Sequence, residues 1–423
     1  MKLKLHWQIA IAIVLAIVCG LVFSPNTHLL GVGFADICAF LGTLFLNGLK
    51  MVIVPLVLSS IICGVANMGS GDGLGRLGGK TILFYMSSSL LAILVGLLFV
   101  NILAPGIIDG EPAQERLNLS ATEDVNATLA KVEGRGTGDI AAVFLRMLPP
   151  NIVSAAAEGQ MLGLICFALL FGFYMLKIEP ENRNTLKSFW QGVFDVMMHI
   201  TMLIMRFAPL GVFGLVAGTV LMTGFEAFKP LLIFFITVVL ALATHMFVTM
   251  PLLLKNIAKV KPTRHFRAMA PALLTAFSTA SSSGTLPVTM ECVEKNAGVS
   301  NKTTSFVLPL GATINMDGTA LYECVAAMFI AQAYGLDLTF GTQFLIVLMA
   351  LLTSIGVAGI PSASLVAITI ILSAVGLPLE GVGLLLVTDR ILDMLRTGVN
   401  VFSDSCCAVV IAKTEGEENV LTS

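Results

Sequence analysis

One stretch near the C-terminus decides how this chain can fold: residues 383–413 read GLLLVTDRILDMLRTGVNVFSDSCCAVVIAK. The stretch is apolar and long enough to cross a bilayer, yet it carries aspartates, arginines and an asparagine. On a helix, its polar residues fall within an arc of roughly 100°; they are Asp389, Asp393, Arg396, Thr397, Asn400 and Asp404. A charge at the centre of a bilayer costs roughly 2.5–3.5 kcal/mol or more. The stripe therefore indicates a functional face inside a membrane protein, unless it is a salt-bridged helix in a soluble core.

The composition favours the membrane protein. Of the 423 residues, 57% are hydrophobic and only 12% are charged, whereas soluble domains carry about 25% charged residues. We therefore expect an all-α polytopic membrane protein embedded in the lipid bilayer. The net charge of −2, with basic residues confined to short loops, argues against a nucleic-acid surface. The eight cysteines lack the spacing of metal ligands, and we expect no cofactor.

Apolar runs of roughly 20 residues or more predict the transmembrane helices. Six runs precede the basic loop at 255–267; they are 7–23, 37–67, 81–104, 140–176, 189–222 and 228–254. The excess of basic residues places that loop and the N-terminus in the cytoplasm, and the acidic stretch 105–139 outside. We expect a multi-pass protein of the cell inner membrane with both termini cytoplasmic.

Two later segments, 268–290 and 344–375, are each interrupted halfway by small and polar residues, STASSSGTLP (278–287) in the first and SIGVAGIPSAS (354–364) in the second. Each half is too short to span a bilayer, and each break is too polar to face lipid. We interpret them as re-entrant helical hairpins that enter from opposite sides. Each is followed by a full span, at 306–331 and 383–413, which together make an inverted repeat. Ordinary helices with Gly/Ser kinks are the alternative.

The seventh span carries Asn315, Asp317 and Thr319 at intervals of two residues. In a continuous helix Asn315 and Asp317 would point about 160° apart. An unwound segment, which Gly318 permits, would aim both inward. Carbonyl and carboxylate oxygens suit a hard cation such as Na⁺, so we expect Asp317, and Asp404 of the last span, to bind cations. The alternative is a buried aspartate that caps a restarted helix.

Groups that bind carboxylates are expected nearby. The tip of the first hairpin offers free backbone N–H groups at a helix N-terminus. Arg396 offers a planar fork for a second carboxylate, and Asp393 can hold a primary ammonium. Together these groups describe an acidic amino acid as the substrate. By spacing alone, Arg396 and Asp393 can equally neutralise each other as a structural pair.

Four motifs make the whole chain resemble the glutamate transporter family, the dicarboxylate/amino acid:cation symporters. They are SSSGTLP at 281–287, NMDGT at 315–319, GIP at 359–361 and the spacing Asp393-x-x-Arg396-Thr-x-x-Asn400-x-x-x-Asp404. The resemblance implies an elevator-type homotrimer with eight transmembrane helices and two re-entrant hairpins. Its scaffold would comprise residues 1–77 and 140–227, its transport domain 78–105 and 228–423, and its extracellular loop 106–139.

The same resemblance assigns ligands. Substrate would be bound by Ser282, Thr319, Gly359, Ile360, Asp393, Arg396, Thr397 and Asn400. Asp393 would take the amino group and Arg396 the side-chain carboxylate. Sodium ions would use three sites: Gly311, Asn315, Asn400 and Asp404; Thr313, Met316, Ser354, Ile355 and Val357; and Tyr85, Ser88, Ser89, Asn315 and Asp317.

The chain departs from that family in three places. Relatives often carry an arginine beside the hairpin serines or just after the aspartate of the last span, where this chain has Ala280 and Met394. Arg390 is a candidate replacement. Ser364 stands where many relatives have glycine, close to the substrate, which bears on substrate selectivity.

Glu323 indicates which ions are coupled to transport. Family members that also carry a proton, and counter-transport potassium, have a glutamate at this place, whereas sodium-only archaeal relatives have glutamine. Glu323 therefore predicts proton coupling, unless it is a buried neutral glutamate without a role.

The leading prediction is a sodium-coupled symporter for L-glutamate or L-aspartate, with proton symport and potassium antiport through Glu323. A proton- or sodium-driven C4-dicarboxylate carrier is the alternative, disfavoured because such a substrate has no ammonium for Asp393. A neutral amino acid exchanger would leave Arg396 unpaired, and an anion channel would be a secondary activity. We expect no catalysis, because no histidine of the hairpins or later spans accompanies the hairpin serines.

Overall fold

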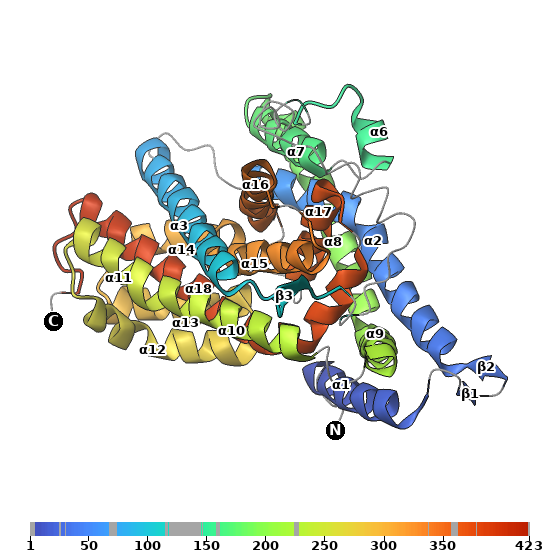
Figure 1. Cartoon of the computed structure of the whole chain (residues 1–423). Coiled ribbons are helices and arrows are strands. Elements are labelled where there is room, and N and C mark those ends of the chain that lie inside the picture. The colour runs from blue at the N-terminus through green and yellow to red at the C-terminus, as the bar shows by residue number, and fades with distance from the viewer. Residues whose placement is uncertain are drawn as a thin grey trace.

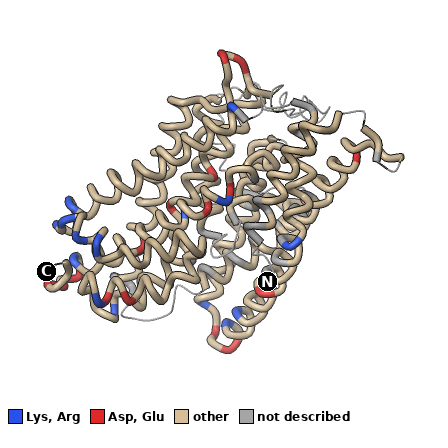
Figure 2. The backbone as a smooth tube through the Cα atoms, turned by 90° about the horizontal axis from the view of Figure 1, so that it is seen from below, with Lys and Arg blue, Asp and Glu red and all other residues tan. Residues whose placement is uncertain are grey.

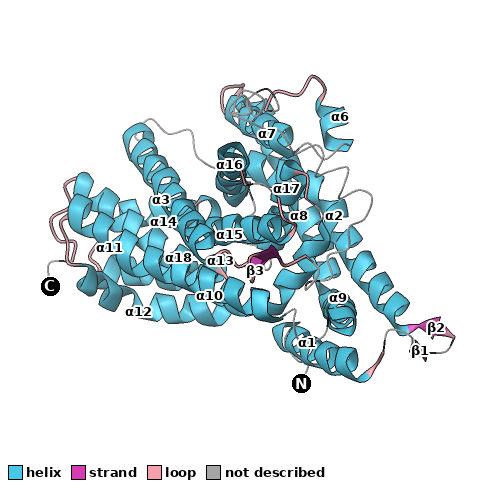
Figure 3. Cartoon of the chain, in the orientation of Figure 1, coloured by secondary structure: helices cyan, strands magenta, loops and turns pink. Residues whose placement is uncertain are grey.

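The structure is a computed structural model, and it describes residues 5–24, 27–29, 31–66, 74–114, 117, 145, 147–157, 161–223, 228–336, 338–356, 363–377 and 379–421. Most of these residues are helical (Figures 1 and 3), which confirms the all-α class. Within these ranges the strands form two short antiparallel hairpins. They are β1 (His28–Leu29) with β2 (Val32–Gly33), and β3 (Ile107–Ile108) with β4 (Glu111–Pro112).

One group of helices surrounds α2 (Phe34–Ala66), which packs on α7 (Met161–Met175), α8 (Pro180–Arg206) and α9 (Ala208–Thr223). α1 (Leu5–Val22) packs on α9, and α6 (Ile152–Ala157) on α7. Glycines bring α2 and α9 close together, since a Cβ at Gly214 would lie 2.5 Å from the carbonyl oxygen of Cys38.

The predicted span 189–222 is wrong as a single helix. α8 begins earlier, at Pro180, and the helix is interrupted at Phe207 before α9 starts. Pro209 is the second residue of α9, where its missing N–H removes no intrahelical hydrogen bond. The proline therefore favours a new helix start at this point.

The other group contains α3 (Leu74–Leu103) and α10 (Phe228–Thr244), which pack on each other and on α15 (Asp317–Ala333). α10 continues through π-helical turns at η2 (His245–Thr249) and η3 (Leu254–Ala258), with α11 (Met250–Leu253) between them. α18 (Val382–Thr414) packs on α10, α14 (Asn301–Ile314) and α15, and a 3-10 turn, η5 (Leu379–Gly381), precedes it.

The first predicted hairpin corresponds to α12 (Pro262–Thr279) and α13 (Ser282–Glu291), which pack on each other. The π-helical turn η4 (Cys292–Asn296) follows. The break in the first predicted hairpin is shorter than expected, because only Ala280, with φ +49°, and Ser281 separate α12 from α13. In the second predicted hairpin, α16 (Phe340–Gly356) packs on α17 (Ala363–Val375), and the segment between them, with Gly359 and Ile360, lies outside the described residues.

The predicted unwinding of the seventh span is confirmed. α14 ends at Ile314 and α15 begins at Asp317, with Asn315 at φ −100° and ψ 95° and Met316 at φ −121° and ψ 61° between them. The reason expected for it was wrong, because Gly318 is already helical. Glycine is needed there for close approach instead: a Cβ at Gly318 would lie 2.6 Å from the Arg396 carbonyl oxygen.

Among the described residues, three helices are long and apolar enough to cross a membrane: Arg76–Leu103, Lys229–Ala258 and Val387–Thr414. The last is the most enclosed by protein, as expected for a helix with a polar face. The total of eight spans stays a prediction.

The C-terminal segment 415–421 crosses the ends of several helices. The Glu417 carboxylate accepts hydrogen bonds from the Ser300 backbone N–H at 2.8 Å and from the Thr303 hydroxyl at 2.6 Å. Burial raises the pKa of the Glu417 carboxyl, but the hydrogen bonds from Thr303 and Ser300 outweigh burial and hold the pKa below its ordinary value. Arg264 Nη1 donates to the Leu421 carbonyl oxygen at 3.0 Å. The segment thus connects α18 to α14 and α12.

Candidate binding site

The guanidinium of Arg396 lies at the centre of the site and is 1% exposed. Its Nη1 and Nη2 each donate to Asp389 Oδ1 at 3.1 Å, and Nη2 also donates to Asp393 Oδ1 at 3.0 Å. The ring of Tyr322 on α15 lies 3.9 Å from the Arg396 Cζ atom, which adds a cation–π contact. Figure 2 shows charged segments in the interior of the bundle as well as at its ends. Two carboxylates and one aromatic ring therefore hold a buried cation on α18.

The sequence left open whether Arg396 and Asp393 neutralise each other, and in this structure the two side chains do bind each other. Asp389, which belongs to the predicted polar stripe but had no assigned role, is the second partner. Arg390 lies on the other side of Asp393, with Nη1 3.6 Å from Asp393 Oδ2. The guanidinium of Arg396 is buried and hydrogen-bonded to carboxylates. A substrate carboxylate can therefore replace one of these carboxylates as its partner.

Asn400 joins α18 to the start of α15. Its Oδ1 accepts a hydrogen bond from the Gly318 backbone N–H at 2.8 Å, and its Nδ2 donates to Thr319 Oγ1 at 3.2 Å. Thr397 donates to the Asp393 carbonyl oxygen at 2.8 Å. The structure thus brings together the predicted substrate ligands of α15 and α18.

Asp317 of α15 is completely buried, and its carboxylate contacts side chains from α3, α18 and η2. Its Oδ1 accepts hydrogen bonds from Ser89 at 2.7 Å and Ser88 at 3.2 Å on α3. Its Oδ2 accepts one from Ser403 on α18 at 2.6 Å and lies 3.1 Å from His245 Nε2 in the π-helical turn η2. A carboxylate among hydroxyl oxygens offers the hard ligands that Na⁺ favours.

A second buried carboxylate, Asp404, lies beside the end of α14. Asn315 Nδ2 donates to Asp404 Oδ1 at 2.9 Å. Gly311 leaves open the space between this carboxylate and Tyr85: a Cβ there would lie 2.5 Å from both Asp404 Oδ1 and Tyr85 Oη. The Tyr85 hydroxyl donates to the Val307 carbonyl oxygen at 2.9 Å. The structure therefore groups the predicted sodium ligands of α3, α14 and α18.

The remaining predicted ligands are less fully described. Ser282 is buried at the first turn of α13, where Ser281 Oγ caps the helix by accepting from the Gly284 N–H at 3.0 Å. Met316 and Ser354 are buried, and the Ser354 hydroxyl donates to the Leu351 carbonyl oxygen at 2.9 Å. Outside the described residues or side chains lie Val357, Gly359, Ile360 and the side chains of Thr313 and Ile355.

Glu323 is fully buried on α15. Its Oε2 accepts a hydrogen bond from Thr353 of α16 at 2.8 Å, while Oε1 finds no hydrogen-bond partner among the described residues. Among the described residues, Glu323 therefore connects α15 to α16 through a single hydrogen bond.

Sequence reasoning missed four residues that contact the predicted ligands: Tyr322, Asp389, Ser403 and His245. Asp389 lies on the same predicted polar arc as Arg396, and this shared face was a signal that could have indicated their pairing. His245 carried a signal as well, because an ionisable side chain inside an apolar span marks a functional site by default. Ser403 and Tyr322 carried no signal, since their contacts arise only when α18 packs on α15.

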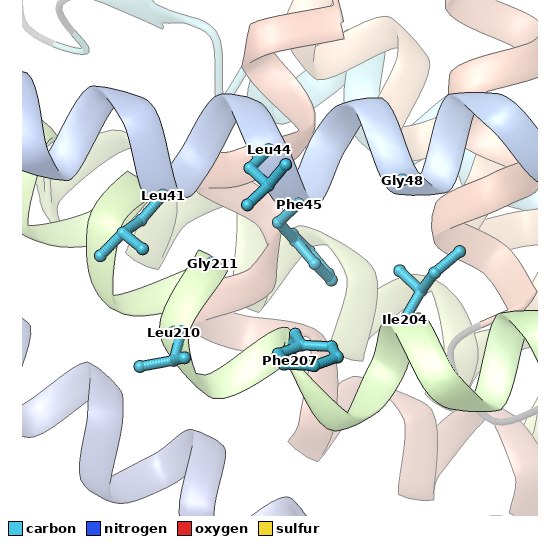
Figure 4. Close-up of a pocket in the computed structure, with 8 residues that line it drawn as sticks. All are labelled: Leu41, Leu44, Phe45, Gly48, Ile204, Phe207, Leu210 and Gly211. Carbon is cyan, nitrogen blue, oxygen red and sulfur yellow. The ribbon is translucent and has the colours of Figure 1, made fainter.

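A separate apolar pocket of about 290 Å³ lies between α2 and the α8–α9 interruption (Figure 4). Its lining carries no polar side chain and does not suit a charged amino acid; it consists of Leu41, Leu44, Phe45, Gly48, Ile204, Phe207, Leu210 and Gly211.

Comparisons with known proteins find relatives along nearly the whole chain. The chain is 37% identical over 421 residues to a proton/sodium-glutamate symport protein of Geobacillus stearothermophilus, covering 99% of this chain and 96% of that protein. It is 34% identical over 417 residues to the proton/glutamate-aspartate symporter of Escherichia coli K12, covering 98% and 93%. It is 35% identical over 469 residues to excitatory amino acid transporter 3 of Mus musculus, covering 98% and 87%. Residues 5–414 match the sequence model of one transporter family, and the chain therefore belongs to the sodium:dicarboxylate symporter family.

Proposed function

We propose that this protein is a sodium-coupled symporter of L-glutamate and L-aspartate. The observation that carries the proposal is the buried Arg396 between Asp389 and Asp393, next to the carboxylates Asp317 and Asp404. An acidic amino acid offers a carboxylate for the arginine and an ammonium for an aspartate. The relatives named as glutamate and aspartate symporters support the same substrate class.

Substrate binding exchanges partners within the site. The side-chain carboxylate of the substrate takes guanidinium hydrogen bonds that Asp393 holds at 3.0 Å. Asp393, released from Arg396, then accepts the substrate ammonium. Asp389 keeps its two contacts at 3.1 Å and holds the guanidinium in place during the exchange. The number of charge pairs is thereby maintained, which limits the cost of burying a charged substrate.

Sodium ions are co-transported cargo at the Asp317 and Asp404 clusters. Asn315 Nδ2 bonds Asp404, and its Oδ1 lies 3.3 Å from the Ser88 hydroxyl of the Asp317 cluster. Asn400 fixes the start of α15 to the substrate helix. A cation that orders this unwound segment also orders the substrate ligands, so each ligand raises the affinity for the other by the same factor.

Transport by an elevator movement within a homotrimer belongs to this proposal. The helices around α2 would form the scaffold of residues 1–77 and 140–227, and the helices around α15 and α18 the mobile unit of 78–105 and 228–423. The packing of α2 with α7, α8 and α9, and of α15 with α3, supports this division. The protein would lie in the cell inner membrane with both termini in the cytoplasm.

Glu323 would carry the symported proton and exchange it for potassium. Its support is the burial of the side chain and the single hydrogen bond from Thr353, which leaves one carboxylate oxygen without a partner in the described part of the chain. Replacing Glu323 by Gln keeps the acceptor for Thr353 but removes the titration. Uptake by Glu323→Gln should then lose its dependence on a proton gradient, and an unchanged dependence would remove this role.

Uptake of labelled L-aspartate into liposomes tests the proposed function. We expect uptake under an inward sodium gradient, with competition by unlabelled L-glutamate and none by leucine. Arg396→Ala should abolish aspartate binding, whereas Arg206→Gln, at an exposed arginine of α8, should retain it. Full aspartate binding in Arg396→Ala would refute the role of this arginine.

A further inference from the structure

Asp393 lies between two arginines. Its Oδ1 accepts from Arg396, while its Oδ2 faces Arg390 Nη1 at 3.6 Å, too far for a hydrogen bond but close enough for charge attraction. The side chain of Asp393 is 16% exposed and that of Arg390 is 32% exposed, so water screens this second pair only partly. Arg390 Nε is buried without a hydrogen-bond partner among the described residues. Arg390 is thus a cation held beside the predicted ammonium binder.

This geometry matters when substrate occupies Arg396. Under the proposed function, the substrate carboxylate displaces Asp393 from Arg396, and Asp393 then needs another cation. An amino acid supplies that cation with its own ammonium. A C4-dicarboxylate such as succinate supplies none, and an unpaired carboxylate in a mostly buried position is strongly unfavourable.

Arg390 can supply the cation that Asp393 lacks when a dicarboxylate is bound. From 3.6 Å, a small side-chain rotation brings Nη1 into hydrogen-bond range of Asp393 Oδ2, with no change in the helix. Arg390 and Asp393 are three residues apart on α18, so they share a face. An arginine at this position can therefore stand in for the substrate ammonium, and it also competes with that ammonium when an amino acid binds.

We infer that Arg390 is a specificity-determining residue: it neutralises Asp393 when the bound substrate lacks an ammonium group, and so extends the substrate range from acidic amino acids to C4-dicarboxylates. The inference rests on the proposed function, because it assumes that aspartate and succinate bind at Arg396. It predicts that the preference for aspartate over succinate depends on the charge at residue 390.

Competition binding tests the inference. Succinate and unlabelled L-aspartate, which differ in the ammonium group, are titrated against labelled L-aspartate on purified full-length protein in saturating sodium. The wild type is compared with Arg390→Gln, Arg390→Lys and the control Arg206→Gln. In Arg390→Gln we expect the succinate inhibition constant to rise about tenfold relative to that of aspartate, which corresponds to about 1.4 kcal/mol. The aspartate constant itself should fall, because a competing cation is gone.

The outcomes separate the two proposals. Arg390→Lys keeps the charge and should retain at least part of the wild-type succinate affinity, and Arg206→Gln should match the wild type. If both inhibition constants rise by the same factor in Arg390→Gln, or if their ratio stays at the wild-type value, the role of Arg390 is overturned. Wild-type protein that binds neither compound would instead refute the proposed function.

Discussion

Replacing Gly311 by alanine should weaken sodium binding at Asp404 and leave the fold intact. A Cβ at this position would lie 2.5 Å from Asp404 Oδ1 and 2.5 Å from Tyr85 Oη. Non-bonded heavy atoms prefer separations of about 3.5 Å, so the two oxygens must retreat by roughly 1 Å. Neither moves freely, because Tyr85 is hydrogen-bonded to the Val307 carbonyl and Asp404 to Asn315, and both side chains are buried.

Overpacking of this kind costs typically 1–3 kcal/mol. To bind sodium the two oxygens must return to the positions from which the Cβ displaces them, so the part of this cost that their retreat relieves reappears on sodium binding, and the full cost corresponds to a loss of sodium affinity between about 5-fold and 150-fold. The assay is the sodium concentration needed for half-maximal L-aspartate binding, measured together with the melting temperature of the protein without ligands. Gly398→Ala on α18 is the matched control, since its Cβ would meet no atom within 4 Å. If Gly311→Ala shows the same half-saturation as Gly398→Ala, the assignment of this space to sodium is wrong.

Three further changes test other contacts. Asp389→Asn removes the negative charge from the side chain that accepts two hydrogen bonds from Arg396, so the melting temperature should fall by the equivalent of about 1.5–3 kcal/mol both without ligand and in saturating L-aspartate; a loss that disappears in saturating aspartate would contradict the statement that Asp389 keeps its contacts during the partner exchange. His245→Ala leaves Asp317 Oδ2 without its ring contact and should raise the sodium half-saturation, whereas His245→Gln should restore much of it; wild-type behaviour of the alanine variant would exclude this role. Since its pKa is lowered in the folded protein, Glu417 contributes stability that is present above its ordinary pKa of 4.5 and is lost as the pH falls through the lowered pKa; the protection factors of the amides at 415–421, which are corrected for the intrinsic pH dependence of exchange, should therefore decrease over that range, unlike in Glu417→Gln.

The spacing of polar residues in the sequence was sufficient to predict the polar face of α18. Its polar residues share an arc because an α-helix repeats every 3.6 residues, and this property is independent of the rest of the fold. The unwound segment was predicted for a related reason: Asn315 and Asp317 cannot share a face of a continuous helix. Both predictions follow from local geometry, which the sequence carries directly.

Contacts between distant segments could not be predicted in the same way. His245 reaches Asp317 across 72 residues, and nothing in either local sequence specifies the partner. The role of Gly318 was misjudged for a similar reason. The sequence suggested backbone freedom, whereas the structure shows that glycine admits the Arg396 carbonyl oxygen of α18 at close range. Close approach becomes visible only after two helices are placed against each other.

The central claim is that one cluster on α14, α15 and α18 binds sodium and an acidic amino acid cooperatively. The most direct measurement is the L-aspartate dissociation constant of purified protein over a range of sodium concentrations, for the wild type and for Asp404→Asn. We predict that wild-type affinity rises steeply with sodium and that the dependence is shallower in Asp404→Asn. An aspartate affinity that is independent of sodium in the wild type would contradict the account.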